Sequence, residues 1–258
     1  MIQLKEHSFR EALQNNQLVM YYQPIIKVEN NSVVAAEALV RWNHPVLGFL
    51  LPGEFISELE ESSIFFDFFV WGLRTACIQN KSWQDQGMAP IRVTVNISVQ
   101  LLRHPLFVQA IISTLRETGL ASNWLELEIT ETSAMQDVEQ SSLTLNQLKD
   151  LGIKITVDDF GIGHSSLNYL RNFPVDTIKI DKSFITKSAT DKKDLAIIRA
   201  ICCLADDLGL EVVAEGVETL DQLANLTMLK NCLVQGFLFS EAIPAQAFFE
   251  HYQSSFLI

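Results

Sequence analysis

The sequence contains no apolar run long enough to cross a bilayer. Its most apolar stretch, residues 64–74, is interrupted by Asp67 and Arg74, well short of the ~20 residues that a membrane helix needs. Residues 1–17 lack the continuous apolar segment of a secretory signal and resemble a short amphipathic helix. We therefore expect a core helix at 64–74, although its many phenylalanines also suit an oligomer interface.

Basic residues are few and scattered. The 258 residues include 19 Lys and Arg against 31 Asp and Glu, which gives a formal net charge of -12. A surface that follows the phosphates of a long nucleic acid needs clustered positive charge, so we expect no such partner. A small anionic ligand stays compatible with this charge if metal ions bridge it.

The four cysteines show no CxxC spacing. Cys202 and Cys203 are neighbours on a predicted helix, while Cys77 and Cys232 stand alone. This pattern predicts buried, small apolar side chains in a protein of a reducing compartment.

Apolar or alternating segments of strand length recur along the chain. They lie at 19–28, 33–42, 91–97, 125–129, 153–157, 177–180, 211–214 and 232–234. Segments with helical periodicity separate most of them, at 68–86, 105–118, 138–151, 195–208 and 220–230. Glycines follow several of these helices, as C-cap signals do: Gly87, Gly119, Gly152 and Gly209. Such alternation predicts a parallel sheet.

The first two predicted strands are an exception to this alternation. Only residues 29–32 join them, which is too short for a crossover helix and predicts an antiparallel hairpin. The chain length is close to the roughly 250 residues of a (β/α)8 barrel. We therefore predict one α/β domain over residues 1–258, a modified TIM (β/α)8-like barrel with an antiparallel first strand.

Polar residues occur at most of the predicted strand ends. They are Glu37, Asn96, Glu128, Asp158, Asp159, Lys179, Glu215 and Gln235. A single carboxylate at a strand end more often caps a helix or faces solvent. In a (β/α)8 barrel, however, all these ends meet at one mouth, where catalytic residues lie. The set therefore predicts a site.

The predicted ligands are almost all oxygens, without paired His or thiolates, and suit Mg2+, Mn2+ or Ca2+ rather than structural zinc. Two carboxylates about 4 Å apart repel by roughly 4 kcal/mol at an effective dielectric of about 20, so either water or cations must stabilise the Asp158–Asp159 pair. Asp158 can bridge two ions and Asp159 can bind one, an arrangement suited to displacement at phosphorus.

Two basic residues accompany the predicted carboxylates. Lys179 is either a solvated or salt-bridged side chain or a group that orients the nucleophile and stabilises phosphoryl charge. Arg41, four residues after Glu37, is the candidate for a bidentate phosphate contact.

A series of short motifs runs along nearly the whole chain. They read QPI at 23–25, EALVRW at 37–42, VNIS at 95–98, EITE at 128–131, DDFG at 158–161, IKID at 178–181, AEGVE at 214–218 and QGF at 235–237. In this order the motifs resemble those of the EAL-domain cyclic di-GMP phosphodiesterases.

The resemblance implies hydrolysis of cyclic di-GMP to linear 5'-pGpG by water that two Mg2+ or Mn2+ ions activate, which lowers a bacterial second messenger. By similarity, the first ion is held by Glu37, Asn96, Glu128 and Asp158, and the second by Asp158, Asp159 and Glu215. The implied catalytic residues are Lys179, Glu37, Asp159 and Gln235, of which Lys179 and Gln235 position water. The implied nucleotide contacts are Gln23, Leu39, Arg41, Asn96 and Asp181. We expect Ca2+ to inhibit.

The family gates its substrate with a loop after the Asp-Asp strand. Glu131 and Glu218 match acidic positions around that loop, although ordinary helix-start carboxylates explain them equally well. Ile162 stands where relatives usually carry Thr, and His164 where they often carry an aromatic residue. Loss of the hydroxyl at Ile162 is expected to alter rate or regulation rather than the reaction. Residues 55–64 also depart from the family pattern, on a peripheral helix.

Two other functions remain open. A catalytically idle cyclic di-GMP receptor usually lacks metal ligands that this chain retains, and only Ile162 favours it. Another metal-assisted phosphoryl reaction follows if fold analogy alone is used. The resemblance further implies a homodimer that touches the gating loop, and a cytoplasmic protein. That protein is either this chain alone or the cytoplasmic part of a larger membrane protein with sensory or regulatory domains.

Overall fold

The computed structural model describes residues 6–130, 138–162, 170, 173–188, 191–227 and 232–253. Its strands are β1 (Leu18–Lys27), β2 (Ser32–His44), β3 (Gly48–Leu50), β4 (Arg92–Ile97), β5 (Leu125–Thr130), β6 (Lys154–Phe160), β7 (Thr177–Ile180), β8 (Glu211–Ala214), β9 (Cys232–Val234) and β10 (Ile243–Pro244). Its α-helices are α1 (Glu6–Gln14), α2 (Ile56–Glu60), α3 (Phe65–Asp85), α4 (Val99–Leu102), α5 (Phe107–Thr118), α7 (Val138–Asp150), α9 (Lys182–Lys187), α10 (Lys192–Leu208), α11 (Leu220–Leu226) and α12 (Ala245–Gln253).

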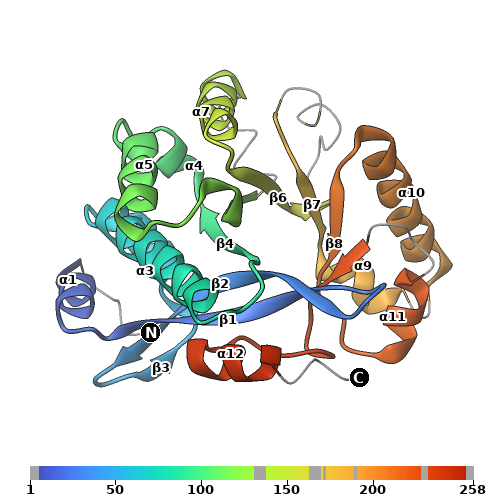
Figure 1. The fold of residues 1–258 in the computed structure, drawn as a ribbon, viewed down its shortest axis with the longest axis horizontal. Coiled ribbons are helices and arrows are strands. Elements are labelled where there is room, and N and C mark those ends of the chain that lie inside the picture. The colour runs from blue at the N-terminus through green and yellow to red at the C-terminus, as the bar shows by residue number, and fades with distance from the viewer. Residues whose placement is uncertain are drawn as a thin grey trace.

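Eight of these strands close into a barrel that helices surround (Figure 1). The strands are hydrogen-bonded in the order β1-β9-β8-β7-β6-β5-β4-β2, and β2 pairs with β1 to complete the ring. Neighbours from β2 through β4 to β9 are parallel, whereas β1 is antiparallel to both β2 and β9. The predicted barrel with an antiparallel first strand is therefore confirmed.

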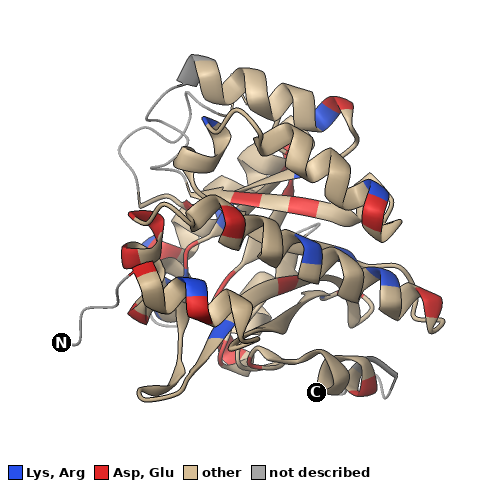
Figure 2. Cartoon of the chain, turned by 90° about the vertical axis from the view of Figure 1, so that its left-hand side faces the viewer, with Lys and Arg blue, Asp and Glu red and all other residues tan. Residues whose placement is uncertain are grey.

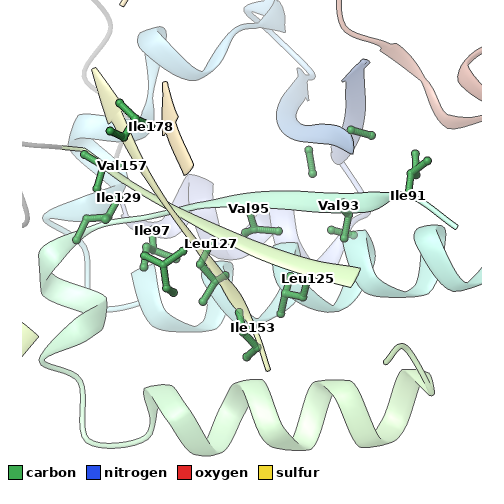
Figure 3. Close-up of a cluster of buried hydrophobic side chains, with 14 of the residues drawn as sticks. Ile91, Val93, Val95, Ile97, Leu125, Leu127, Ile129, Ile153, Val157 and Ile178 are labelled. Atoms are coloured by element: carbon green, nitrogen blue, oxygen red, sulfur yellow. The ribbon is translucent and has the colours of Figure 1, made fainter. Parts of the chain in front are cut away.

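Alternate residues of the parallel strands point outward and pack beneath the helices. In β4 and β5 these are Val93, Val95, Ile97, Leu125, Leu127 and Ile129, all of them buried. Figure 3 shows these rows of side chains side by side on neighbouring strands. Because burial of one such aliphatic side chain contributes about 1.5–3 kcal/mol, this outer layer supplies much of the driving force that closes the barrel.

The intervening residues line the interior of the barrel. Ile25, Ala35, Val213 and Leu233 form a small apolar cluster there. At the N-terminal ends of the strands, the Arg92 Nε donates to Glu126 Oε2 at 2.7 Å, and the Thr156 hydroxyl also donates to Glu126. The Arg92 guanidinium further pairs with Glu211 at 2.9 Å. This end of the barrel is therefore held by its own partly buried ion pairs, separate from the residues of the predicted mouth.

Helix α3 is the core helix that the sequence predicts, with Phe68, Phe69 and Leu73 buried. The N-terminal helix α1 is amphipathic as predicted and buries Phe9 and Ala12. Within the described ranges, no helix has both the length and the apolar character that a bilayer crossing requires.

Three details of the sequence prediction are wrong. The helix predicted over 220–230 ends at Leu226 in α11. Cys203 is exposed while the other three cysteines are buried, because successive helix positions point about 100° apart and only Cys202 faces the barrel. The strands β3 and β10 and the helices α9 and α12 were not predicted, since each is too short or too irregular for a periodic signal.

Asn80 ties α3 to the starts of two strands. Its side chain is fully buried, and its Nδ2 donates to the carbonyl oxygens of Ile91 at 3.0 Å and Trp124 at 3.3 Å. Asn80→Ala is expected to lower the free energy of unfolding by about 1–3 kcal/mol, because buried carbonyls lose their donor. Urea denaturation measures this loss. The exposed Gln86→Ala at the C-cap of the same helix is the control, expected within about 0.5 kcal/mol of wild type. Equal stability of the two variants would contradict this role.

Candidate metal centre and active site

The Lys179 side chain lies among four carboxylates at the C-terminal mouth of the barrel. It projects from β7 and is 1% exposed. Its Nζ lies 2.7 Å from Glu215 Oε1, 2.9 Å from Glu128 Oε2, 3.3 Å from Glu37 Oε2 and 3.7 Å from Asp158 Oδ1. Of the two structural readings left open for Lys179, the solvated one is wrong and the salt-bridged one holds. The rule that functional residues of a barrel lie at the C-terminal ends of its strands therefore correctly predicted that these side chains meet.

Asp158 and Asp159 both face this mouth because β6 is irregular. In a regular strand, neighbouring side chains point to opposite faces. The pairing of β6 with β7 shifts register between Val157 and Phe160, and Asp159 has a left-handed φ of 56°. Oxygen atoms of Asp158, Asp159 and Glu215 consequently lie within 4.8 Å of one another. The strand also continues to Phe160, so the two aspartates lie within it rather than after it.

Amide side chains fix the Glu37 carboxylate. Gln235 Nε2 donates to Glu37 Oε2 at 2.6 Å and to Gln23 Oε1 at 3.0 Å. Gln23 Nε2 in turn donates to the carbonyl oxygen of Ser240 at 3.0 Å, and Asn96 Nδ2 donates to Glu37 Oε1 at 2.9 Å. Both oxygens of Glu37 therefore accept hydrogen bonds, and the orientations of three amides are linked.

Two buried oxygens at the mouth lack a hydrogen-bond partner among the described residues. They are Glu128 Oε1 and Gln235 Oε1. Buried acceptors are normally satisfied by protein, water or an ion. The donor set around them consists of carboxylate and amide oxygens, which Mg2+ and Mn2+ prefer. The residues present therefore fit divalent cations of this class.

Burial raises the pKa of several of these carboxyl groups. The pKa of Glu215 rises to about 7, because burial outweighs the favourable charge of Lys179. Burial also raises the pKa of Glu128 well above its usual range. The pKa of Asp159 is raised by burial and then by the neighbouring charge of Asp158. The protein alone thus stabilises these negative charges incompletely.

The mouth holds Lys179 and Glu37 in their charged forms. Burial acts to lower the pKa of Lys179, but the surrounding carboxylates outweigh it and hold that pKa well above its usual value. Burial likewise acts to raise the pKa of Glu37, yet Lys179 and the amide donors Gln235 and Asn96 bring it below its usual value. One ammonium therefore interacts with several carboxyl groups, which outnumber it.

Glu37 does not lie at the end of its strand. Parallel pairing of β2 with β4 covers only residues 35–38, whereas β2 continues to His44 and stays paired with β1 as far as Trp42. The two strands therefore extend beyond the mouth as an antiparallel ribbon. Leu39 and Arg41 follow Glu37 at alternate positions and share its face of the ribbon.

Asp181 plays a structural part at the start of α9. Its carboxylate is buried and caps the helix by accepting from the Ser183 N–H at 2.9 Å. A nucleotide contact would have to share this side chain with the cap.

The predicted gating-loop residues are only partly described. Glu218 is exposed just before α11, and its N–H donates to Gln222 Oε1 at 2.7 Å. Ile162 is 57% exposed at the edge of the described range. Glu131 and His164 lie outside the described residues.

Two cavities lie near the mouth, and Gln23 and Glu37 line one of them. One of about 220 Å³ lies beside Glu215 and Gln235 and includes Lys182 and Phe237 in its wall. The other, of about 400 Å³, lies beside Leu39 and Asn96 and is mainly apolar. The sequence prediction missed Lys182 and Phe237, because neither is a polar residue at a strand end.

Comparisons with known proteins agree with this geometry. Residues 6–242 match the family model of the EAL domain. The bifunctional diguanylate cyclase/cyclic di-GMP phosphodiesterase MucR of Pseudomonas aeruginosa is 40% identical over 240 residues, which are 93% of this chain and 35% of that protein. The cyclic di-GMP phosphodiesterase NbdA of the same organism is 41% identical over 242 residues, 94% of this chain and 31% of that protein.

The chain thus spans about a third of the length of these curated relatives. A solved structure of the PaMucR phosphodiesterase in complex with c-di-GMP superposes with a TM-score of 0.89 at 40% identity, covering 94% of this chain and 98% of that one. The resemblance inferred from the motifs is confirmed, and the chain belongs to the EAL-domain family.

Proposed function

We propose that this chain is a metal-dependent phosphodiesterase that hydrolyses cyclic di-GMP to linear pGpG. One observation carries the proposal: carboxylates from three strands and from the residue that follows β8 converge with Lys179 and Gln235 at a single mouth. The similarity to MucR and NbdA, which are described as cyclic di-GMP phosphodiesterases, supports the substrate.

The proposed metal ligands are the mouth residues with available oxygens. Glu37, Asn96, Glu128 and Asp158 would hold one ion, and Asp158, Asp159 and Glu215 the other. The Asn96 Nδ2 is engaged by Glu37, which leaves its amide oxygen for the metal. When bound, two divalent ions would lower the pKa of a water molecule and neutralise charge that develops on the phosphoryl group.

Gln235 and Lys179 have distinct proposed tasks. Because Gln235 Nε2 donates to both Glu37 and Gln23, the amide is fixed with its Oε1 as a buried acceptor. That oxygen is suited to accept a hydrogen from the attacking water and so to orient it. The buried Lys179 ammonium is suited to stabilise negative charge on a phosphoryl oxygen, since screening is weak in a buried site.

The surroundings of the mouth support a small dinucleotide substrate. Two cavities, one lined by Gln23 and Glu37 and the other by Leu39 and Asn96, offer room for two bases. Leu39, Arg41 and Asp181 complete the proposed nucleotide contacts. In Figure 2, Lys and Arg lie singly among Asp and Glu on the helices in view. Such a surface favours a small substrate over a long polymer.

We also propose that the chain is the cytoplasmic catalytic part of a longer regulatory protein and acts as a homodimer. The chain covers only about a third of MucR and NbdA, which supports a longer protein. The homodimer rests on the family resemblance.

The test of this function is incubation of the purified chain with cyclic di-GMP and Mg2+ or Mn2+ over a range of protein concentrations. We expect pGpG, no turnover with EDTA, and specific activity that rises as dimers form. Binding of cyclic di-GMP with Mn2+ but without turnover would establish a receptor instead, the function that the exposed Ile162 favours. Hydrolysis of other phosphodiesters in preference to cyclic di-GMP would contradict the substrate.

A further inference from the structure

Arg41 is held in place by two neighbours on the β1/β2 ribbon. Its guanidinium carbon lies 5.5 Å from the centre of the Tyr21 ring, and its Nη1 donates to the Val40 carbonyl oxygen at 2.9 Å. An arginine side chain has about 2 kcal/mol of rotamer entropy to lose on being fixed. These contacts fix it before any ligand binds.

The register of the ribbon explains the placement of Tyr21. Tyr21 pairs with Leu39, and Val19 pairs with Arg41. Tyr21 is therefore the diagonal neighbour of Arg41 on one face, a distance that aromatic and long side chains span. Phe49, on β3, contacts Tyr21 with ring centres 5.6 Å apart. The Tyr21 ring is thus supported from the third strand of the ribbon.

This geometry leaves the phosphate-binding edge of Arg41 accessible. A ring that lies against a guanidinium occupies its face, whereas phosphate oxygens bind in its plane. Within the described part of the chain, the hydrogen bond to Val40 uses Nη1 and leaves Nε and Nη2 without a protein acceptor. That edge can take a bidentate contact with a phosphate.

We infer that Tyr21 is a positioning residue for substrate binding, whose ring holds the Arg41 guanidinium where it meets a phosphate of the dinucleotide. This rests on the proposed function, in which Arg41 contacts the nucleotide. If Tyr21 instead served only to pack the ribbon, its replacement would change the stability of the protein. It would have no specific effect on the affinity for the substrate.

The first experiment compares Tyr21→Leu with Tyr21→Phe, which keeps the ring. The dissociation constant for cyclic di-GMP is measured with Ca2+, and KM and kcat with Mg2+. Tyr21→Leu is expected to raise the dissociation constant and KM about threefold to tenfold, the worth of one partly exposed cation–π contact. Its kcat is expected within about twofold of wild type, and Tyr21→Phe is expected to bind like wild type. Phe49→Leu is expected to raise KM less than Tyr21→Leu.

The second experiment repeats Tyr21→Leu in an Arg41→Ala background. Arg41→Ala alone is expected to weaken binding, and Tyr21→Leu is then expected to add no further loss, because the ring acts through the guanidinium. An undiminished effect in that background, or equal losses in Tyr21→Leu and Tyr21→Phe, would overturn the inference. Unchanged binding in Arg41→Ala would overturn the role of Arg41 and the inference with it, even if metal-dependent turnover is normal. If Tyr21→Leu does not fold, an unchanged KM in Phe49→Leu overturns the inference.

Discussion

Asp159→Asn is expected to lower the turnover of cyclic di-GMP by about three orders of magnitude, equivalent to about 4 kcal/mol of transition-state stabilisation. The substitution removes one of the three carboxylates, Asp158, Asp159 and Glu215, that cluster within 4.8 Å. A neutral amide binds a divalent cation more weakly than a carboxylate does, so the proposed second ion would be lost first.

The same substitution is expected to leave the protein as stable as wild type or more stable when no metal is added. Burial and the charge of Asp158 raise the pKa of Asp159, so its carboxylate is unfavourable in the folded state. Asn removes that charge and, like Asp, accepts the left-handed backbone found there at φ 56°. Loss of activity and gain of stability would then arise from one charge.

Thermal unfolding in EDTA and steady-state kinetics in Mg2+ check both effects on the same preparations. Asp159→Ala is the informative comparison, because alanine also removes the charge but is strained at this backbone angle. A fully active Asp159→Asn enzyme would refute the role proposed for Asp159. A marked drop in the unfolding temperature of Asp159→Asn would refute the claim that the Asp159 carboxylate destabilises the folded protein.

Lys179→Met is expected to abolish activity and to lower the free energy of unfolding by about 3–5 kcal/mol, the usual cost of leaving buried charges unpaired. Lys179 is fully buried and contacts Glu37, Glu128 and Glu215 within 3.3 Å. Methionine has a similar length without the ammonium, so the carboxylates lose their shared cation while packing is largely kept.

Urea denaturation with and without Mn2+ measures this effect. Mn2+ is expected to stabilise Lys179→Met more than wild type, because a ligand that binds only the folded state adds stability by mass action. Lys192→Met, at an exposed position on α10, is the control and is expected within about 0.5 kcal/mol of wild type. If Lys179→Met unfolds like Lys192→Met in EDTA, the carboxylates do not depend on the ammonium.

The barrel and most of its mouth could be predicted because two simple patterns specify them. In β5 the alternation Leu125, Glu126, Leu127, Glu128, Ile129 already separates an apolar outer row from an acidic inner row. The rule that sites lie at the C-terminal ends of barrel strands then selects Glu128 and its counterparts on other strands. Both patterns depend on local spacing, which a single sequence contains.

Features that depend on contacts between distant segments could not be predicted. The register shift that turns Asp159 toward the mouth arises where β6 meets β7. The ion pairs of Arg92 with Glu126 and Glu211 link strands β4, β5 and β8. The role inferred for Tyr21 likewise depends on its register opposite β2. Tyr21, two residues before Gln23, gives no signal of its contacts until the strand pairing is known.

The most direct test of the central claim is to measure binding and hydrolysis of cyclic di-GMP by the same preparation of the chain. With Mg2+ or Mn2+, we predict that bound cyclic di-GMP is converted to pGpG, and that EDTA or Asp159→Asn prevents the conversion. Tight binding of both metal and cyclic di-GMP by a dimeric preparation, with the substrate recovered intact, would contradict the claim that this mouth is a catalytic centre.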